Sequence, residues 1–213
     1  MTDDRPRPGF DHNAFYHRYL LRQVPSPCDR ALDVGCGTGQ FARRLAGRAR
    51  EVEAIDRSSE VIARAREPAG GESGIRFLHA DVADHDLGDS RYDFVSCIAA
   101  IHHMPFAETV TRLRRALRPG GVLAIVGCHR EATPADYLRD LVAIPANVVA
   151  NTVVRARARH GGGPTGQVGT APVMDPEMTL PEIRREASRL LPGAVIRRRL
   201  YWRYTLVYRH PST

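Results

Sequence analysis

The amino-acid sequence predicts a doubly wound α/β fold, and three observations support this. Short apolar segments typical of buried strands alternate with segments in which apolar residues recur at helical spacing. The connections between these segments are short. A length of 213 residues suits one domain with a sizeable core. Because alternating strands and helices form a parallel sheet through right-handed crossovers, we expect a single α/β domain over residues 1–213.

The elements of the first half follow one another regularly. Strands are expected at 30–35, 51–56, 74–81, 91–101 and 121–127, and helices at 10–24, 38–49, 58–67 and 108–121. Thr38 can cap the second of these helices, and Ser58 or Ser59 the third, because a hydroxyl oxygen accepts a hydrogen bond from a free backbone N–H. Pro119 and Gly120 are expected to stop the fourth helix.

The pattern changes after the fifth strand. Residues 133–159 have helical periodicity that Pro145 divides, and residues 160–176 are rich in Gly and Pro, which predicts a loop. A helix is expected at 179–191, where Thr179 and Glu182 have the spacing of a capping box. Residues 194–211 are rich in β-branched and aromatic side chains and predict two strands that turn near 202–204.

Composition limits the class of protein. No apolar run approaches the roughly 18 residues that span a bilayer, and the N-terminal "MTDDRPRPGF" lacks the apolar stretch of a secretory signal. The four cysteines lie far apart and form no C-x-x-C pair, which argues against a disulfide framework or a zinc site. We therefore expect a cytoplasmic protein without a metal.

The formal net charge of +7 comes from arginine alone, since the chain contains no lysine. A positive charge permits attraction to polyanions. The arginines are scattered along the chain rather than gathered in one stripe, and a nucleic-acid partner is therefore not favoured.

The stretch "LDVGCGTGQF" at 32–41 indicates a ligand site. Glycines before a helix leave backbone N–H groups open beside the positive end of the helix dipole, and they admit a ligand close to the main chain. A dinucleotide fold would show G-x-G-x-x-G, whereas the spacing here is Gly35-x-Gly37-x-Gly39. Asp33 just before the loop disfavours a diphosphate and suits a ligand that carries an ammonium group.

Three further features extend this pattern. Asp56 ends the second strand, where a carboxylate can accept hydrogen bonds from both hydroxyls of a ribose. Asp81 ends the third strand and can accept a hydrogen bond from an adenine amine, and "LRPGG" precedes the fifth strand. With these residues, the region 31–127 resembles the class I S-adenosylmethionine-dependent methyltransferases, in particular their small-molecule branch.

The resemblance implies a fold and a cofactor site. It implies a Rossmann-like, seven-stranded sheet in the order 3-2-1-4-5-7-6 with an antiparallel last strand. The cofactor would be S-adenosyl-L-methionine, with S-adenosyl-L-homocysteine as the product. The implied cofactor-binding residues are Asp33, Gly35, Cys36, Gly37, Thr38, Gly39, Asp56, Arg57, Asp81, Val82 and Ile98.

Within this set the resemblance assigns separate roles. Asp33 and the Ile98 carbonyl would lie at the amino group of the cofactor. Asp56 would hold the ribose, with Arg57 beside the adenine. Asp81 and the Val82 backbone would bind the adenine edge.

The acceptor side is less specific. His102 and His103 follow the fourth strand and are the candidate catalytic residues, because an imidazole can remove a proton from a hydroxyl or amine nucleophile. Alternatively, they only pack or hydrogen-bond at the rim of the pocket. The candidate substrate-binding residues are Tyr16, Tyr19, His103, Met104, Trp202 and Arg203. The resemblance also implies that a cap helix at 10–24 and a helical lid insertion at 132–179 cover the substrate, although the aromatic residues of that helix also fit a core-packing stripe.

Three functions remain in competition. The favoured one is methyl transfer to an O, N or C nucleophile of a small molecule, such as a metabolite or a product of secondary metabolism. The second is an RNA or protein methyltransferase of the same fold, against which the Asn/Asp-Pro-Pro-Tyr motif is missing after the fourth strand. The third is a dinucleotide oxidoreductase or a non-catalytic cofactor-binding protein. The sequence leaves the oligomeric state open.

Overall fold

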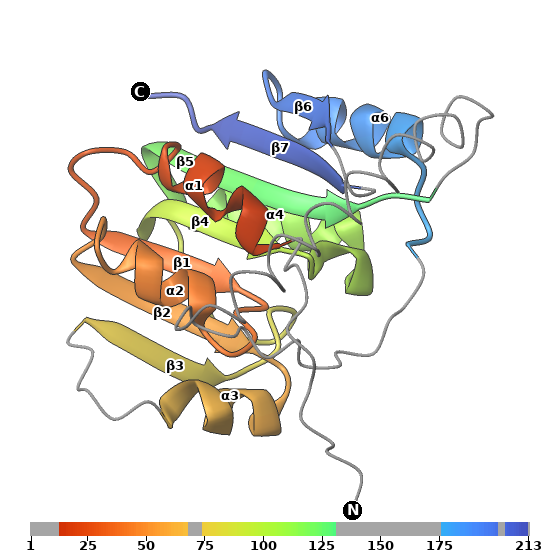
Figure 1. Ribbon diagram of the computed structural model, residues 1–213. Coiled ribbons are helices and arrows are strands. Elements are labelled where there is room, and N and C mark those ends of the chain that lie inside the picture. The colour runs from red at the N-terminus through yellow and green to blue at the C-terminus, as the bar shows by residue number, and fades with distance from the viewer. Residues whose placement is uncertain (1–12, 68–73, 131–175, 200–202, 213) are drawn as a thin grey trace, which may run out of the picture.

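The protein is built on a seven-stranded sheet in the order β3-β2-β1-β4-β5-β7-β6, seen in a computed structural model (Figure 1). The structure describes residues 13–67, 74–130, 176–199 and 203–212. The strands are β1 (Arg30–Val34), β2 (Glu51–Asp56), β3 (Ile75–His79), β4 (Tyr92–Ile98), β5 (Leu117–Cys128), β6 (Val195–Arg198) and β7 (Arg203–Arg209). The strands β1 to β5 pair in parallel, and β7 runs antiparallel to both β5 and β6. The predicted strand order and the antiparallel strand are confirmed.

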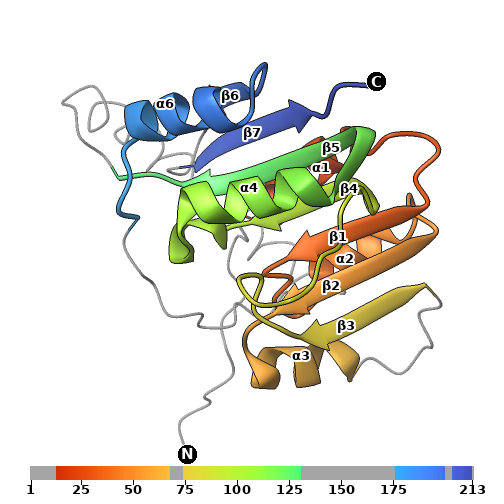
Figure 2. The ribbon, with the colours of Figure 1, turned by 180° about the vertical axis from the view of Figure 1, so that it is seen from behind.

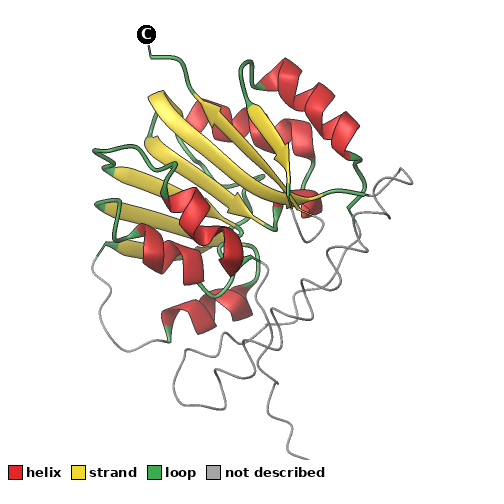
Figure 3. Ribbon diagram, turned by 45° about the horizontal axis from the view of Figure 1, so that its top comes forward, coloured by secondary structure: helices red, strands yellow, loops and turns green. Residues whose placement is uncertain are grey.

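Helices cover both faces of the sheet (Figure 3). They are the 3₁₀ turns η1 (Ala14–Tyr16) and η2 (Ile101–His103) and the α-helices α1 (His17–Leu21), α2 (Gln40–Leu45), α3 (Ser59–Arg66), α4 (Phe106–Ala116) and α6 (Leu180–Leu190). Figure 1 shows α1 and α2 in front of the sheet, and the view from behind in Figure 2 shows α4 and α6 over the opposite face. None of these helices is long and apolar enough to cross a bilayer.

The core forms two apolar layers, one on each face. Side chains alternate along a strand, so neighbours in β1 serve different layers: Leu32 packs with Ile55 and Leu113, whereas Ala31 packs with Phe41. Burial of both faces explains why the strands read as nearly continuous apolar runs in the sequence.

Two predicted helix starts are confirmed and one is wrong. The Ser58 hydroxyl accepts a hydrogen bond from the Val61 N–H (3.3 Å), and the capping box of Thr179 and Glu182 is present. Thr38 does not cap α2. Gly39 occupies that position in the left-handed conformation (φ +79°), with no side-chain hydrogen bond to the helix. The backbone of a glycine can make this entry turn without a capping hydroxyl.

Several boundaries differ from those predicted. Within residues 13–24, only η1 and α1 are helical; residues 10–12 lie outside the described part. The strand β4 ends at Ile98 rather than 101, because Ala99 turns into the left-handed region (φ +51°). The helix α4 ends at Ala116, where Leu117 is already extended, and not at Pro119. The turn between β6 and β7 lies before Tyr204, which is inside β7. Residues 132–175 of the lid predicted at 132–179, and Trp202, also lie outside the described residues.

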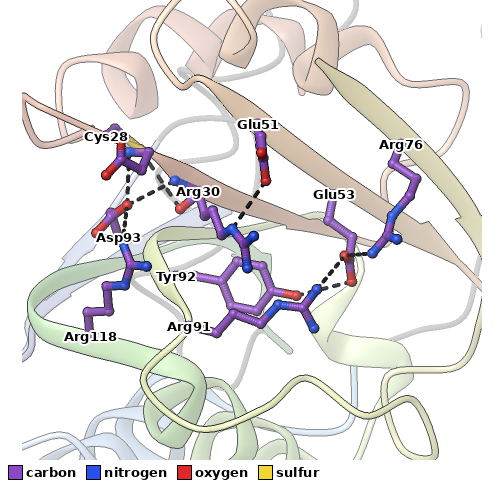
Figure 4. Close-up of polar contacts among 10 residues, drawn as sticks. Cys28, Arg30, Glu51, Glu53, Arg76, Arg91, Tyr92, Asp93 and Arg118 are labelled. Atoms are coloured by element: carbon purple, nitrogen blue, oxygen red, sulfur yellow. Dashed lines mark hydrogen bonds and ion pairs between the residues drawn. The ribbon is translucent and has the colours of Figure 1, made fainter. Parts of the chain in front are cut away.

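Part of one face of the sheet has a buried charged side chain where no helix covers it. The β3–β4 connection is a non-helical loop, and the face of β2 beneath it presents Glu53, whose side chain is only 7% exposed. The Tyr92 hydroxyl donates to Glu53 Oε1 (3.0 Å), and the Glu53 carboxylate also pairs with Arg76 and Arg91 (Figure 4). His85 Nε2 lies 3.1 Å from the same carboxylate. These partners compensate for the burial of a charge at a position that a covering helix would otherwise make apolar.

Replacing Glu53 with glutamine is expected to lower the free energy of unfolding by about 1–3 kcal/mol, because two arginines and a tyrosine lose a charged partner. Hydrogen bonds from Arg76, His85 and Tyr92 hold the pKa of Glu53 below its usual value despite burial. Because the pKa of Glu53 is lower in the folded protein, its carboxylate stabilises the fold at pH values above the ordinary carboxyl pKa. This stabilisation disappears as the pH falls through the pKa of the folded state. Urea unfolding at pH 7 and pH 3 measures the effect, with the exposed Glu51→Gln as control. A loss at pH 3 as large as that at pH 7 would contradict this role for the charge.

Candidate active site

The candidate residues meet at the carboxyl ends of the parallel strands. The strand register places the last residue of β1, Val34, beside Ile55 of β2 and Cys97 of β4. Cys128, at the end of β5, pairs with Arg203 at the start of β7. The loop after β1, Asp56, Asp81, the histidines after β4, and Arg203 therefore lie at one edge of the sheet, where ligands bind in open α/β folds.

The glycine loop leads from β1 to α2, and its three glycines all have positive φ (+65°, +56° and +79°). A Cβ on Gly35 would collide with the side chain of Ala100, and one on Gly39 would lie 2.5 Å from the Phe77 ring. A Cβ on Gly37 would meet no atom of the described residues within 4 Å. Close packing with the protein therefore explains Gly35 and Gly39, while Gly37 faces open space in the described part of the chain.

Asp56 fixes this loop. Its Oδ2 accepts a hydrogen bond from the Gly37 N–H (3.0 Å), and its Oδ1 accepts one from the Ser58 N–H (2.9 Å). A carboxylate oxygen has lone pairs for a second donor, so both oxygens remain able to accept from a ribose. The same side chain thus shapes the loop and keeps the acceptor capacity that a ribose would need.

A positively charged side chain supports the loop from outside. On α2, Arg43 donates through Nη1 to the Thr38 carbonyl (2.6 Å) and through Nη2 to the Ala65 carbonyl at the end of α3 (2.6 Å). Its guanidinium lies over the Phe77 ring, 5.4 Å from the centroid. The same ring limits the space at Gly39, so α3 and β3 both help to set the loop conformation. The sequence offered no signal for Arg43.

Asp33 is the most unusual group at this edge. Its side chain is buried (1% exposed), and its Oδ1 accepts a hydrogen bond from the Ser96 hydroxyl (2.8 Å). Within the described residues, Asp33 Oδ2 has no hydrogen-bond partner. Burial raises the pKa of Asp33 to about 7, and the negative charge of Asp56 adds to the rise while Ser96 opposes it. A buried carboxylate oxygen without a donor is costly unless a ligand supplies one.

The adenine-side candidates lie on the neighbouring strand ends. Val82 is buried, whereas Asp81 is exposed and accepts a hydrogen bond from the Ala83 N–H through Oδ1 (2.9 Å). Arg57 is exposed beyond β2, and its carbonyl oxygen lies 3.1 Å from His79 Nε2. Cys36 is buried in the loop. Burial raises the pKa of its thiol well above the usual range, so the thiol is uncharged.

His102 and His103 form a pair in η2, with ring centroids 4.1 Å apart. Burial lowers the pKa of His102 to about 4, with further lowering by His103 and Arg203. Burial and Arg57 also lower the pKa of His103. A base with a pKa near 4 is weak at neutral pH, because an efficient general base has a pKa near the working pH. The described surroundings therefore favour a positioning role for His102.

The other acceptor-side candidates have separate environments. Tyr16 is buried (5% exposed) within one of the apolar core layers, as the core-packing alternative predicted. Tyr19 lies under the guanidinium of Arg199, 4.6 Å from its ring centroid, and Met104 packs against the opposite core layer. Arg203 donates to Asn13 Oδ1 through Nε (3.2 Å) and Nη2 (3.0 Å), which joins β7 to the start of the N-terminal segment.

Two features bear on other kinds of site. The described residues contain no group of three His, Cys, Asp or Glu side chains that could hold a metal ion. A hollow of about 530 Å³ lies beside α4 and the end of α6, and none of the candidate residues lines it. The candidate residues that the structure describes therefore lie at the strand ends and not in this hollow.

Comparisons with known proteins bear on these residues. Residues 32–125 match the family model of a methyltransferase domain. A methyltransferase of Mycobacterium tuberculosis is 36% identical over 203 residues, which cover 93% of this chain and 96% of the relative. The trans-aconitate 2-methyltransferase of Variovorax paradoxus is 34% identical over 148 residues, covering 68% of this chain and 53% of that protein. Among solved structures, an S-adenosylmethionine-dependent methyltransferase from Mesorhizobium loti matches with a TM-score of 0.62 at 20% identity, over 91% of this chain and 96% of that one.

Proposed function

Because the chain belongs to the class I S-adenosylmethionine-dependent methyltransferases, we propose that it transfers the methyl group to an oxygen, nitrogen or carbon nucleophile of a small molecule. S-adenosylmethionine is the cofactor of this family, and S-adenosylhomocysteine is the product. The proposed acceptor is a metabolite or a natural product, and the proposed location is the cytoplasm, where the four free cysteines would stay reduced.

The observation that carries the proposal is Asp33 Oδ2, which has no hydrogen-bond partner among the described residues. S-adenosylmethionine has an ammonium group that can donate to this oxygen, and its positive charge would stabilise the ionised carboxylate. The open space at Gly37 gives the ligand access to the backbone of the same loop. The residues present therefore fit the cofactor.

The remaining candidates would divide the cofactor between them. Asp56 would bind the ribose hydroxyls through lone pairs that the loop N–H groups leave available. Asp81 and the buried Val82 would lie at the adenine, with Arg57 beside it. The Ile98 carbonyl, which precedes the left-handed turn at Ala99, would accept from the ammonium group.

Methyl transfer requires little covalent chemistry from the protein itself. The cofactor supplies an activated methyl group on a sulfonium, so the chain must bind both partners, align them in line and exclude water. His102 and His103 would flank the acceptor and orient it. The similarity to a methyltransferase whose named substrate is trans-aconitate, a small acid, supports a small-molecule acceptor.

Asp56→Ala is expected to weaken S-adenosylhomocysteine binding by roughly 1.5–3 kcal/mol, because a pair of charge-assisted hydrogen bonds is lost. Calorimetry on both proteins measures this, with Asp86→Ala on the β3–β4 loop as a control that should bind like the wild type. NADH should bind neither protein. Equal affinity of wild type and Asp56→Ala would contradict the assigned site.

The nature of the acceptor is tested with radiolabelled cofactor. When the protein and S-adenosyl-[methyl-³H]methionine are added to a bacterial extract, the label is expected in the small-molecule fraction. Label that accumulates in RNA or protein instead would show that the acceptor is a macromolecule.

A further inference from the structure

We propose that Arg112 of α4 positions the turn after β3 that would bind the adenine of the cofactor, and that it thereby sets the preference for this base. This inference rests on the proposed cofactor site and adds to it a residue from a helix outside that site. It depends on the hydrogen bonds of Arg112, on the groups that they leave available and on the donors and acceptors of the base.

Residues 81–85 form a compact turn directly after β3. The Asp81 carbonyl accepts hydrogen bonds from the Asp84 N–H (3.2 Å) and the His85 N–H (2.8 Å). The Asp81 side chain accepts a further one from the Ala83 N–H through Oδ1 (2.9 Å). No helix continues this turn, because the β3–β4 connection is a loop. The carbonyl groups at its end therefore need partners from elsewhere in the chain.

Arg112 supplies these partners. Its Nε atom donates to the Val82 carbonyl (3.0 Å), and its Nη2 atom donates to the His85 carbonyl (2.8 Å). A charged donor strengthens both hydrogen bonds, and the rigid fork of a guanidinium fixes the two carbonyls relative to each other. The Val82 side chain is buried in the same apolar layer as Leu113 of α4. Helix α4 thus holds the turn through both the backbone and a side chain.

One peptide group of the turn is held at both ends. In the peptide between Val82 and Ala83, the carbonyl oxygen accepts from Arg112. Its N–H donates to Asp81 Oδ1. Because a peptide group is planar, these two bonds fix its orientation. They leave two groups for a ligand: within the described residues, the Val82 N–H has no acceptor and Asp81 Oδ2 has no donor.

The two available groups match adenine. Its edge presents a donor at the N6 amine and an acceptor at N1, which would pair with the Asp81 carboxylate and the Val82 N–H. Hypoxanthine presents an acceptor at O6 and a donor at N1, so both contacts would be reversed. A base with the wrong pattern leaves the protein groups without partners, and this loss produces the discrimination.

The test compares S-adenosylhomocysteine with S-inosylhomocysteine, which carries hypoxanthine. Calorimetry on the wild-type protein should show binding of the inosyl ligand that is roughly 100-fold weaker. Arg112→Met should bind S-adenosylhomocysteine roughly tenfold more weakly and the inosyl ligand about as the wild type does, because a displaced turn loses its contacts with adenine. The ratio of the two dissociation constants should therefore fall about tenfold. Arg112 lines the hollow beside α4, so a methionine side chain has room there.

A matched control and a conservative variant separate positioning from general support. Arg115 lies on the same helix and pairs with Asp89 of the same loop (Nη2–Oδ2, 3.0 Å), outside the turn. Arg115→Met should therefore keep the wild-type ratio. Arg112→Lys keeps the charge and a single donor group, and it should recover part of the ratio.

The turn can also be observed without a ligand. Hydrogen exchange at the Ala83 and His85 amides should be faster in Arg112→Met than in the wild type, since the hydrogen bonds of both amides lie within the turn. If Arg112→Met does not fold, Arg112→Gln, which keeps one N–H donor group, takes its place in both measurements.

Three results would overturn the proposal. The first is a wild-type protein that binds both ligands equally, which would remove the adenine contacts assigned to the turn. The second is an unchanged ratio in Arg112→Met, which is the result that a structural link alone would give. The third is a ratio that falls as far in Arg115→Met. In all three cases, S-adenosylhomocysteine binding by the wild type would leave the proposed methyltransferase function standing. A wild-type protein that binds neither ligand would remove both.

Discussion

Replacing Asp33 with asparagine is expected to weaken S-adenosylhomocysteine binding by roughly 30- to 5,000-fold, or about 2–5 kcal/mol, because a buried charge pair with the ligand is lost. The same substitution should make the ligand-free protein more stable at pH 8. There the wild type holds an ionised carboxylate in the core with one hydrogen-bond donor, Ser96, among the described residues, whereas an amide avoids that cost. Opposite signs for stability and affinity are the signature of a group retained for binding.

Isothermal titration calorimetry and urea unfolding measure the two effects. Ser96→Ala is the control, since it removes the neighbouring donor and keeps the carboxylate. A variant that loses affinity and stability together would show that Asp33 has a structural role only.

The raised pKa of Asp33 also predicts how the binding of S-adenosylhomocysteine depends on pH. Its pKa in the free protein is about 7, so the group carries a proton below that value. A cationic ligand favours the carboxylate, and binding therefore releases this proton. Affinity should fall by up to about tenfold per pH unit as the pH drops below 7, and this contribution should level off above 7. Titrations between pH 5.5 and 7 should show the slope in wild type and its absence in Asp33→Asn.

Replacing Gly35 with alanine is expected to lower the free energy of unfolding by about 2–4 kcal/mol. Left-handed backbone costs an alanine about 1–2 kcal/mol, and the new methyl group collides with Ala100. Gly37→Ala is the matched variant with positive φ and open space, so it should cost only about 1–2 kcal/mol of stability. It should instead impair S-adenosylhomocysteine binding by about tenfold or more, because the methyl group occupies the space proposed for the ligand. Equal unfolding losses for the two variants would contradict the distinction.

Much of the site could be predicted because its residues follow the ends of strands. The apolar runs located the strands, and parallel pairing then brought Asp33, Asp56 and Asp81 to one edge. The alternation of strands and helices gave the doubly wound class. The strand order and the cofactor came from the resemblance to known methyltransferases, not from periodicity.

The parts that the sequence did not predict depend on contacts between distant residues. Ser96 donates to Asp33 across 63 positions, and Arg203 reaches Asn13 across 190, so no local pattern signals either bond. Ala99 in the left-handed region ends β4 early, and alanine gives no sign of that conformation. Thr38 was a sound capping candidate by type, but the loop brings Gly39 to the helix entrance in its place.

The hydrogen bonds of Arg43 have a practical consequence for engineering. A mutant library confined to residues 35–39 would contain few tolerated substitutions. Every glycine in this segment has positive φ, and Ala100 and Phe77 limit the space beside Gly35 and Gly39. Phe77 and Ala65 lie outside that segment, yet Arg43 connects both to the Thr38 carbonyl. Substitutions at Phe77 would shift the loop without entering the ligand space. Selections for enlarged cofactor analogues should therefore begin on β3, at Phe77, whose ring lies close to Gly39.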